Sequence, residues 1–296
     1  MNTKTQPRFL ITGSSGLLGS AITSILDAQE ISWTALHHGE EGWDPESGVF
    51  DPKHLEGITG VIHLAGEGIA AGRWTDNQKQ KIHDSRVKGT RALAEGMAAA
   101  DQKPAVLITA SATGFYGSRG DEICTESSQP GQGFLTEVVK DWESAADPAR
   151  DAGIRVVHLR LGIVLSAKGG ALKKMLPPFK FGLGGRLGDG QMWMSWIHLQ
   201  DAAQAFVTAA TKDSFTGIYN LVAPHPVQNS DFTTALGNAL KRPTVFPVPA
   251  FMIKLLLGEM GESLLLASTR VLPEKLKASE LEFTYPKIDE ALKDLL

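Results

Sequence analysis

The stretch Phe9-Leu10-Ile11-Thr12-Gly13-Ser14-Ser15-Gly16-Leu17-Leu18-Gly19 lies close to the N-terminus of the chain. It opens with a short apolar run that is typical of a buried strand, and three glycines follow at once. An amphipathic segment comes next, with Ile22, Ile25 and Leu26 at helical spacing. The sequence therefore predicts a strand, a tight turn and a helix, in that order.

The three glycines suit a turn that holds a dinucleotide. Gly13 permits the sharp turn, Gly16 lets the backbone approach a pyrophosphate, and Gly19 lets the helix pack against the sheet. Free N–H groups at the start of the helix would then receive the phosphate charge. Glycine makes up 31 of the 296 residues, so a plain structural turn is the alternative. The G-x-x-G-x-x-G spacing resembles the extended short-chain dehydrogenase/reductase superfamily, whose epimerases and dehydratases use nicotinamide cofactors.

Charge and cysteine content exclude several classes of function. The chain has 29 basic and 33 acidic residues and no basic cluster, so we expect no nucleic-acid partner. Cys124 is the single cysteine, which excludes an intramolecular disulfide framework and a cysteine-rich metal site. We expect no metal centre.

The apolar segments do not predict a membrane protein. Residues 1–8 are polar and lead into the first strand without the apolar region of a signal peptide, so the expected location is the cytoplasm. The apolar stretch at 251–257 is interrupted by Lys254 and is too short to cross a bilayer. We expect it to form a core or interface helix.

The second predicted strand, residues 31–36, ends in His37-His38. An NAD enzyme of this class would carry a carboxylate here for the ribose 2′-hydroxyl, and no Asp or Glu occupies the strand tip. Two imidazoles could instead donate hydrogen bonds to a 2′-phosphate, although Glu40 and Glu41 complicate the local charge. The pattern favours NADP(H) over NAD(H). The alternative is that both histidines are solvated loop residues.

A continuous apolar run at 61–64 is typical of a parallel strand that is buried on both faces. Because ligands of such sheets bind at the carboxyl ends of strands, the small residues Ala65 and Gly66 would let the backbone pass close to the ribose and pyrophosphate. A helical segment then carries Lys81, Ser85 and Arg86 near one face, and its two cationic side chains would reach the cofactor phosphates. A solvated basic helix face is the alternative.

The next strand, 105–109, runs into Ala110-Ser111-Ala112-Thr113-Gly114-Phe115-Tyr116-Gly117. In the extended superfamily that this segment resembles, a Ser or Thr at the end of the strand hydrogen-bonds the reacting oxygen. Ser111 is the nearest match and Thr113 the second. Tyr116, or another group not identified by the sequence, would handle the proton.

The superfamily also uses a Tyr-x-x-x-Lys pair, in which lysine lowers the pKa of the catalytic tyrosine. The matching helix here is 134–143, and it contains no tyrosine. Counting four residues back from Lys140 gives Thr136, and alignment on Glu143 places Leu135 and Val139 in the two positions. A hydride transfer with a general acid would therefore need a different proton donor, or it does not take place.

The chain changes character after a buried strand at 156–165. Glycine and proline pairs between 169 and 190 predict a loop-rich stretch. We therefore expect an α/β fold: a Rossmann-like doubly wound parallel sheet in residues 1–168, with later segments returning to it, and a small C-terminal α/β lobe, mainly for substrate, in 169–296. A Trp-Ile-His-x-x-Asp pattern at 196–201 resembles the superfamily's link between lobes, and its His198 and Asp201 are either catalytic or structural.

Motifs spread from residue 9 to the C-terminus resemble one family within this superfamily. It is the atypical extended short-chain family of epimerase-family, or cell-division-inhibitor-like, proteins, part of the NAD-dependent epimerase/dehydratase superfamily. The motifs are Ser111 to Gly117, Phe134 with Trp142-Glu143, Gly169-Gly170 with Met175 to Phe179, Gly182 to Gly185, Trp196-Ile197-His198 and Arg270-Val271-Leu272-Pro273.

The resemblance implies an NADP(H)-binding domain and a poorly defined substrate. The family usually has a Ser/Thr-Arg pair where this chain has His37-His38. The resemblance and the residues described above together give the expected cofactor contacts. They are Gly13, Ser14, Ser15, Gly16, Leu17, Leu18, Gly19, His37, His38, Leu64, Ala65, Gly66, Lys81, Arg86 and Val164.

Two functions follow from these features. The first is an NADP(H)-dependent oxidoreductase or epimerase that acts on a small, sugar-like substrate between the lobes, as a monomer or homodimer. The second is a non-catalytic NADP(H)-binding protein that senses redox state or scaffolds a partner, and the missing Tyr-x-x-x-Lys pair motivates it. Fold does not decide between them, because function lies in the site.

Overall fold

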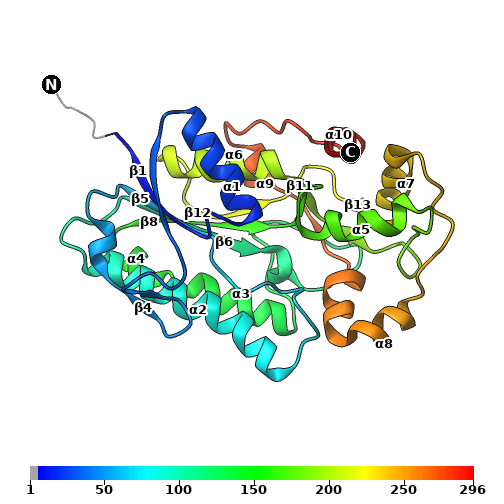
Figure 1. Ribbon diagram of the computed structural model, residues 1–296, viewed down its shortest axis with the longest axis horizontal. Coiled ribbons are helices and arrows are strands. Elements are labelled where there is room, and N and C mark those ends of the chain that lie inside the picture. The colour runs from blue at the N-terminus through cyan, green and yellow to red at the C-terminus, as the bar shows by residue number, and fades with distance from the viewer. Residues whose placement is uncertain (1–5) are drawn as a thin grey trace.

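A six-stranded parallel sheet forms the centre of the computed structural model, which describes residues 6–296 (Figure 1). The strand order is β12-β8-β6-β5-β1-β2, and every neighbouring pair is parallel. The strands are β1 (Arg8–Thr12), β2 (Ser32–Leu36), β5 (Gly60–His63), β6 (Val106–Ala112), β8 (Arg155–Leu161) and β12 (Gly217–Leu221). The order reverses between β1 and β5, so a ligand is expected outside the carboxyl ends of these two strands. The predicted doubly wound α/β fold is confirmed.

Helices cover both faces of the sheet. In Figure 1, α1 (Leu17–Ala28) and α6 (Leu199–Thr211) lie above it, and α2 (Asp76–Ala99), α3 (Phe134–Ser144) and α4 (Asp147–Asp151) lie below. Because both faces are covered, the strands are apolar along most of their length.

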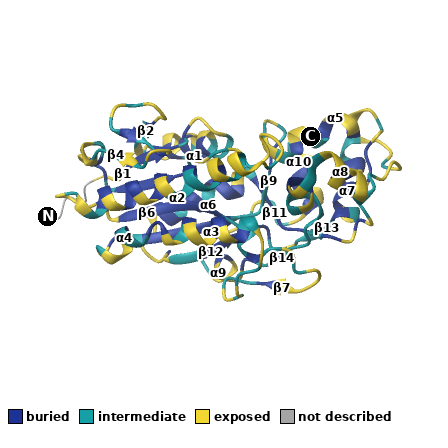
Figure 2. Ribbon diagram, turned by 90° about the horizontal axis from the view of Figure 1, so that it is seen from below, coloured by how far each residue is buried: buried dark blue, intermediate teal, exposed yellow. Residues whose placement is uncertain are grey.

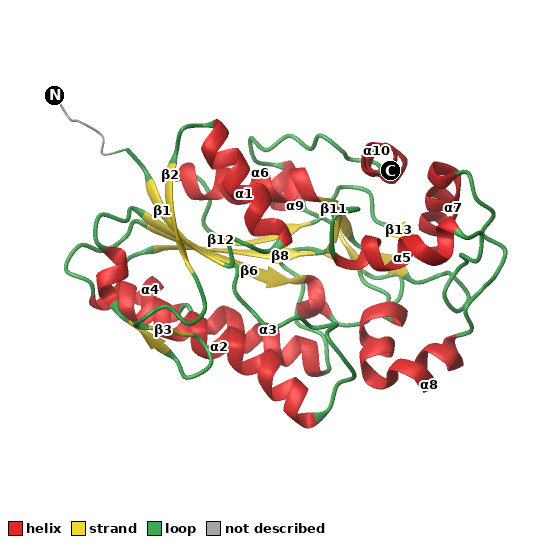
Figure 3. Cartoon of the chain, viewed as in Figure 1, coloured by secondary structure: helices red, strands yellow, loops and turns green. Residues whose placement is uncertain are grey.

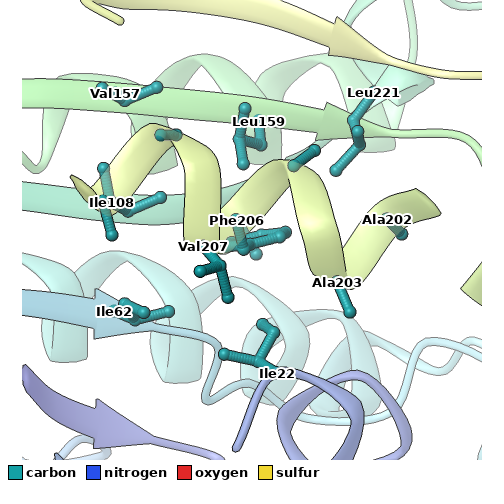
Figure 4. Close-up of a cluster of buried hydrophobic side chains, with 14 of the residues drawn as sticks. Ile22, Ile62, Ile108, Val157, Leu159, Ala202, Ala203, Phe206, Val207 and Leu221 are labelled. Carbon is teal, nitrogen blue, oxygen red and sulfur yellow. The ribbon is translucent and has the colours of Figure 1, made fainter. Parts of the chain in front are cut away.

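The core on the α1 and α6 side is built from alternate residues of the strands. Ile62, Ile108 and Val157 pack there against Phe206 and Val207 of α6 (Figure 4). On the opposite face, Leu10, Val61, Leu107 and Val156 pack against Leu93 and Met97 of α2.

A second lobe has its own apolar core, which includes Leu172, Trp196, Phe232 and Leu292. It lies on the right of Figures 2 and 3. Its helices are α5 (Gly170–Lys180), α7 (Asn229–Leu240), α8 (Ala250–Gly261) and α10 (Ile288–Leu295). α6 and β12 belong to the first sheet and its covering layer.

The remaining elements are short. They are β3 (Trp43–Asp44), β4 (Val49–Phe50), η1 (Pro52–Leu55), η2 (Thr113–Tyr116), β7 (Ile123–Cys124), β9 (Ile163–Leu165), β10 (Trp193–Met194), β11 (Trp196–His198), β13 (Val227–Gln228), η3 (Glu262–Leu266), β14 (Arg270–Val271) and α9 (Glu274–Lys277).

Helix α5 corrects the prediction of a loop-rich stretch over 169–190. The helix contains Pro177 and Pro178, which remove two backbone donors. Leu172, Leu176 and Phe179 lie on its inner face and are buried in the second core. Burial of these side chains therefore outweighs the local preference of proline.

The apolar segment 251–257, expected as a core or interface helix, lies in helix α8. Ile253 is buried, whereas Phe251, Leu255 and Leu256 are exposed, so the helix is not fully within the core and an interface stays a prediction. Among the described residues, no helix is both long and apolar enough to cross a membrane.

His198 and Asp201 stabilise the start of α6 through side-chain hydrogen bonds to the backbone. The Nδ1 atom of His198 accepts a hydrogen bond from the N–H of Gln200 at 3.1 Å and caps the helix. The two carboxylate oxygens of Asp201 accept from the N–H groups of Thr284 and Tyr285 at 2.9 and 3.0 Å. These contacts give both residues the structural role that was one of the two expectations.

Candidate functional site

The glycine turn lies at the point where the strand order reverses. Gly13 has a φ of +72°, and a Cβ atom there would lie 3.1 Å from the backbone of Leu64 and of Ala65. A side chain at Gly13 would therefore push apart the carboxyl ends of β1 and β5. At Gly19, a Cβ atom would clash with the backbone of Gly13 and Ser14.

Gly16 differs from the other two glycines because its outer side is open. A Cβ atom there would meet only the carbonyl oxygen of Gly13, at 3.2 Å. Helix α1 begins at the next residue with no side-chain cap and no acidic residue in its first turn. Its first N–H groups are thus left for an anionic ligand, as at other helix N-termini that bind phosphate.

A groove of about 500 Å³ runs beside this turn. Ser15, Gly16 and Leu17 line one side, and Lys168 and Gly169 approach from the loop after β9. Sequence reasoning missed Lys168. Its place in the loop after a strand and immediately before two glycines is a signal that could have found it.

The segment after β5 is held against the turn by Thr12. The Oγ1 atom of Thr12 accepts hydrogen bonds from the N–H groups of Leu64 at 3.2 Å and Ala65 at 3.3 Å. The expected contacts Leu64, Ala65 and Gly66 are therefore brought to the glycine turn. Ser14 is buried there, and Leu17 and Leu18 are half-buried.

The side chain of Arg86 in α2 also lies against the segment after β5. Its guanidinium lies against Gly66, where a Cβ atom would be 3.4 Å from Cζ of Arg86. It donates to the carbonyl of Ile82 at 3.0 Å and lies 5.2 Å from the ring centroid of Trp142. Burial lowers the pKa of Arg86 to about 10, against the opposing charge of Glu67. Within residues 6–296 no carboxylate forms an ion pair with it, so its remaining donors can serve a phosphate.

The other expected cofactor contacts are distributed over the tip of β2, helix α2 and strand β9. His37 and His38 are exposed at the tip of β2, and the N–H of His37 donates to Glu40 Oε1 at 2.9 Å. Lys81 is exposed on α2, whereas Arg86 on the same helix is half-buried. Val164 in β9 packs against the main core.

At the end of β6, Ser111 is 2% exposed and belongs to a buried polar network. Its Oγ donates to Glu143 Oε1 at 2.6 Å. Arg160 of β8 donates to both oxygens of the same carboxylate, at 2.8 and 2.7 Å. Burial alone would raise the pKa of Glu143, but the Arg160 and Ser111 bonds and the Arg160 charge hold it below its ordinary value.

Tyr116 completes this network. It is fully buried, its hydroxyl donates to Asn220 Oδ1 at 2.6 Å, and it accepts from Arg160 at 3.0 Å. Burial raises the pKa of Tyr116, although the Arg160 charge opposes the rise. The hydroxyls of Ser111 and Tyr116 are both hydrogen-bonded within the protein, and their roles at a substrate stay predictions.

Thr113, the second sequence candidate, lies just beyond the strand. It is half-buried, and its Oγ1 donates to the carbonyl of Leu161 at 3.3 Å. Of the two hydroxyls expected to orient a substrate, Thr113 is the one outside the Glu143 and Arg160 network.

Helix α3 confirms that the usual Tyr-x-x-x-Lys pair has no substitute in register. Leu135 packs against Gly114, and Val139 is buried. Thr136 is also buried and donates to the carbonyl of Gly114 at 3.1 Å. Lys140 points outward to Glu137, at 2.9 Å. In the described part of the chain, no three His, Cys, Asp or Glu side chains gather as a metal site would require.

Comparisons with known proteins agree with this arrangement. The NAD dependent epimerase/dehydratase family matches residues 9–221, and a domain of unknown function, DUF1731, matches residues 248–295. An epimerase family protein of Mycobacterium bovis, Mb2239, is 42% identical over 288 residues, covering 95% of each chain. The chloroplastic SDR39U1 homolog of Arabidopsis thaliana is 34% identical, covering 97% of this chain and 86% of the homolog.

A solved structure is also close. The human epimerase family protein SDR39U1, crystallised with NADPH, superposes with a TM-score of 0.87 at 29% identity and covers 97% of this chain and 98% of its own. The glycine turn, the parallel sheet and the matched residues together show that the chain belongs to the NAD dependent epimerase/dehydratase family.

Proposed function

We propose that this chain binds NADP(H) at the glycine turn and uses it as an oxidoreductase or epimerase on a small, sugar-like substrate. The observation that carries the proposal is the uncapped start of α1 beside the open side of Gly16. The human relative crystallised with NADPH supports the same cofactor. Arg86 adds a guanidinium without a carboxylate partner among the described residues.

Selection of NADP(H) over NAD(H) would come from the tip of β2. His37 and His38 are exposed there, and neither position supplies the carboxylate that grips a ribose 2′-hydroxyl. The substitution His37→Asp should therefore weaken NADPH binding and strengthen NADH binding. If the affinities for NADPH and NADH are the same before and after the substitution, these histidines do not select the cofactor.

The proposed chemistry is the transfer of a hydride between the nicotinamide and a carbonyl carbon of the substrate. In the reducing direction NADPH becomes NADP⁺, the carbonyl becomes an alcohol, and water supplies the proton to its oxygen. Thr113 would orient that oxygen. Ser111 and Tyr116 would act as positioning residues, because their hydroxyls fix the end of β6 through Glu143 and Arg160.

The test is a panel of carbonyl compounds and nucleotide sugars added to the NADPH complex, with the loss of NADPH fluorescence as the readout. We expect turnover of at least one compound, and a decrease of about tenfold or more in kcat for Thr113→Val with little change in NADPH affinity. Thr113→Ser, which keeps the hydroxyl, is the matched control. Turnover that is unchanged in Thr113→Val would exclude this role.

A non-catalytic NADP(H)-binding protein is the second candidate. The burial of Ser111 and Tyr116 supports it, because both hydroxyls already have hydrogen-bond partners within the protein. This function predicts tight NADPH binding, no turnover across the panel and a partner whose capture depends on NADPH. Capture that is insensitive to NADPH would rule it out.

A further inference from the structure

Large apolar side chains are exposed in two loops of the second lobe, one after α5 and one between α7 and α8. They are Phe181, Leu183, Val245 and Phe246, with exposed fractions of 81, 60, 68 and 54%. The segment between α7 and α8 lies at the end of the molecule opposite to the N-terminus (Figures 1 and 3). None of the four side chains lines the groove beside the glycine turn.

Hydrogen bonds hold these two loops side by side. The N–H of Phe246 donates to the carbonyl of Gly184 at 3.4 Å, and Nε of Arg242 donates to the carbonyl of Lys180 at 2.9 Å. The backbones are so close at Gly185 that a Cβ atom there would clash with the carbonyl of Phe246. The exposed apolar side chains of both loops therefore belong to one part of the surface.

Helix α8 follows the second loop and adds four more exposed apolar side chains: Phe251, Met252, Leu255 and Leu256. Their spacing of i, i+1, i+4 and i+5 puts them on one face of the helix, and Ile253 on the other face is buried. A monomer rarely exposes a contiguous apolar patch of more than about a few hundred Å². The two loops and this helix face therefore mark a contact surface.

The same segments carry positive charge only. Residues 170–188 and 241–258 contain seven Lys and Arg residues and no Asp or Glu, although the whole chain has more acidic than basic residues. Lys180, Arg186 and Arg242 are exposed, and no carboxylate of residues 6–296 forms an ion pair with them. This charge favours an anionic partner over a second copy of the chain, which would bring like charges together.

Carboxylates at the borders of these segments leave the loop cations free. Glu259 and Glu262 follow at the end of α8, where they pair with Lys79 and Lys254. Asp189 follows the first loop and accepts a hydrogen bond from the N–H of Gln191 at 2.9 Å. The positive charge of the two loops is therefore available to a partner.

We propose that this end of the second lobe binds the surface of an anionic phospholipid bilayer. The exposed apolar side chains enter the interfacial region, and the lysines and arginines around them contact lipid phosphates. A peptide partner is usually held in a groove, but Phe181, Phe246 and Phe251 line neither the groove beside the glycine turn nor the smaller one beside α7. The contact is peripheral, because the apolar segment 251–257 is too short to cross the bilayer.

The test is flotation of the full chain with vesicles of phosphatidylcholine alone and of phosphatidylcholine mixed with phosphatidylglycerol. We expect binding to the mixed vesicles that weakens as salt is added, and little binding to the neutral ones. Phe181→Ser/Phe246→Ser and Lys180→Gln/Arg242→Gln should each weaken binding by about tenfold or more. Glycerol phosphate, the free form of the headgroup, should not displace the protein from the vesicles.

Two control variants change exposed side chains elsewhere and should bind like the wild type. Val49→Ser removes an apolar side chain from β4, and Arg91→Gln removes a positive charge from α2. All variants should keep the wild-type melting temperature and NADPH affinity, so the result does not depend on the cofactor.

Equal binding to neutral and mixed vesicles would overturn the proposal, as would equal binding by the wild type and Phe181→Ser/Phe246→Ser. Displacement by glycerol phosphate would show a ligand other than the bilayer surface. A dimer in analytical ultracentrifugation that the phenylalanine variant dissociates would show that a second copy covers this surface, and either result would contradict the membrane contact.

Discussion

Arg160 is a large charged side chain in the interior, and its partners explain how it is tolerated. It is 2% exposed, pairs with both oxygens of Glu143 and lies 3.4 Å from the ring centroid of Phe115. A buried charge is acceptable only when its partners satisfy it. The end of β6 therefore depends on this residue for its shape.

We expect Arg160→Ala to decrease the free energy of unfolding by about 3–5 kcal/mol, because Glu143 would be left buried without its partner. Urea unfolding measures the change. The double variant Arg160→Met/Glu143→Leu should lose less than Arg160→Ala, because it leaves no unpaired charge. A loss below about 1 kcal/mol in Arg160→Ala would show that the pair is not needed.

Two buried histidines predict a dependence of stability on pH. Thr12, His63, Thr109 and His158 lie opposite one another on four neighbouring strands, and each histidine Nδ1 is 2.7 Å from the threonine hydroxyl oxygen. Burial lowers the pKa of both histidines to about 4. Around His158, the charge of Glu143 opposes this shift, while Arg150 and Arg160 add to it.

The unfolded chain binds more protons than the native one between about pH 6.5 and about pH 4, so acidification through this range should destabilise the protein. Each histidine contributes up to about 1.4 kcal/mol per pH unit. Urea unfolding at several pH values checks this. His158→Gln should reduce the slope, because it removes one of the two buried histidines. A slope that is the same in the wild type and His158→Gln would contradict the assignment.

Sequence reasoning reached Ser111 and Tyr116 but not their environment. Their partners Glu143, Arg160 and Asn220 lie 32 to 104 residues away along the chain. Strand spacing indicates a buried position, but it does not show which polar groups meet there. The polar network around these two predicted catalytic residues could not be predicted from the sequence for this reason.

At the scale of elements, the strand, turn and helix at residues 9–28 agree with the prediction because local signals define them. The same holds for α3, which was expected at 134–143 and spans Phe134–Ser144. α5 was missed because its stability comes from the second core, and the prolines within it indicate the opposite locally. The packing of its apolar side chains in the second core therefore determines that this segment is a helix.

The close packing of the glycine turn predicts how a substitution there changes stability. Gly19→Ala should decrease the free energy of unfolding by about 2 kcal/mol, because its Cβ would force α1 away from Gly13 and Ser14. Gly72→Ala is the control, since nothing lies within 4 Å of its added carbon. Thermal unfolding of the two variants gives the comparison. Equal melting temperatures would contradict the close packing of α1 on the turn.

At the scale of the whole molecule, segments far apart in sequence connect the two lobes. Arg73 donates to the carbonyl of Leu255 at 3.3 Å, Lys174 donates to that of Ala70 at 3.2 Å, and Lys79 pairs with Glu259. Residues 70–79, in the segment after β5 and the start of α2, therefore connect the first lobe to α5 and α8. The sequence indicated two lobes, but it gave no sign of these contacts, because each joins residues more than 100 positions apart.

The central claim is that the open side of Gly16 receives the pyrophosphate of NADP(H). The most direct test is to titrate the wild type, Gly16→Val and Gly72→Ala with NADPH and NADH and to follow melting temperature and fluorescence. Binding to the native state alone stabilises it by about 2.7 kcal/mol at a free ligand concentration of about 100 times Kd. We predict that NADPH stabilises the wild type and Gly72→Ala more than NADH does, and that Gly16→Val stays folded but loses this stabilisation. No stabilisation of the wild type by either nucleotide, or equal NADPH binding by Gly16→Val, would contradict the claim.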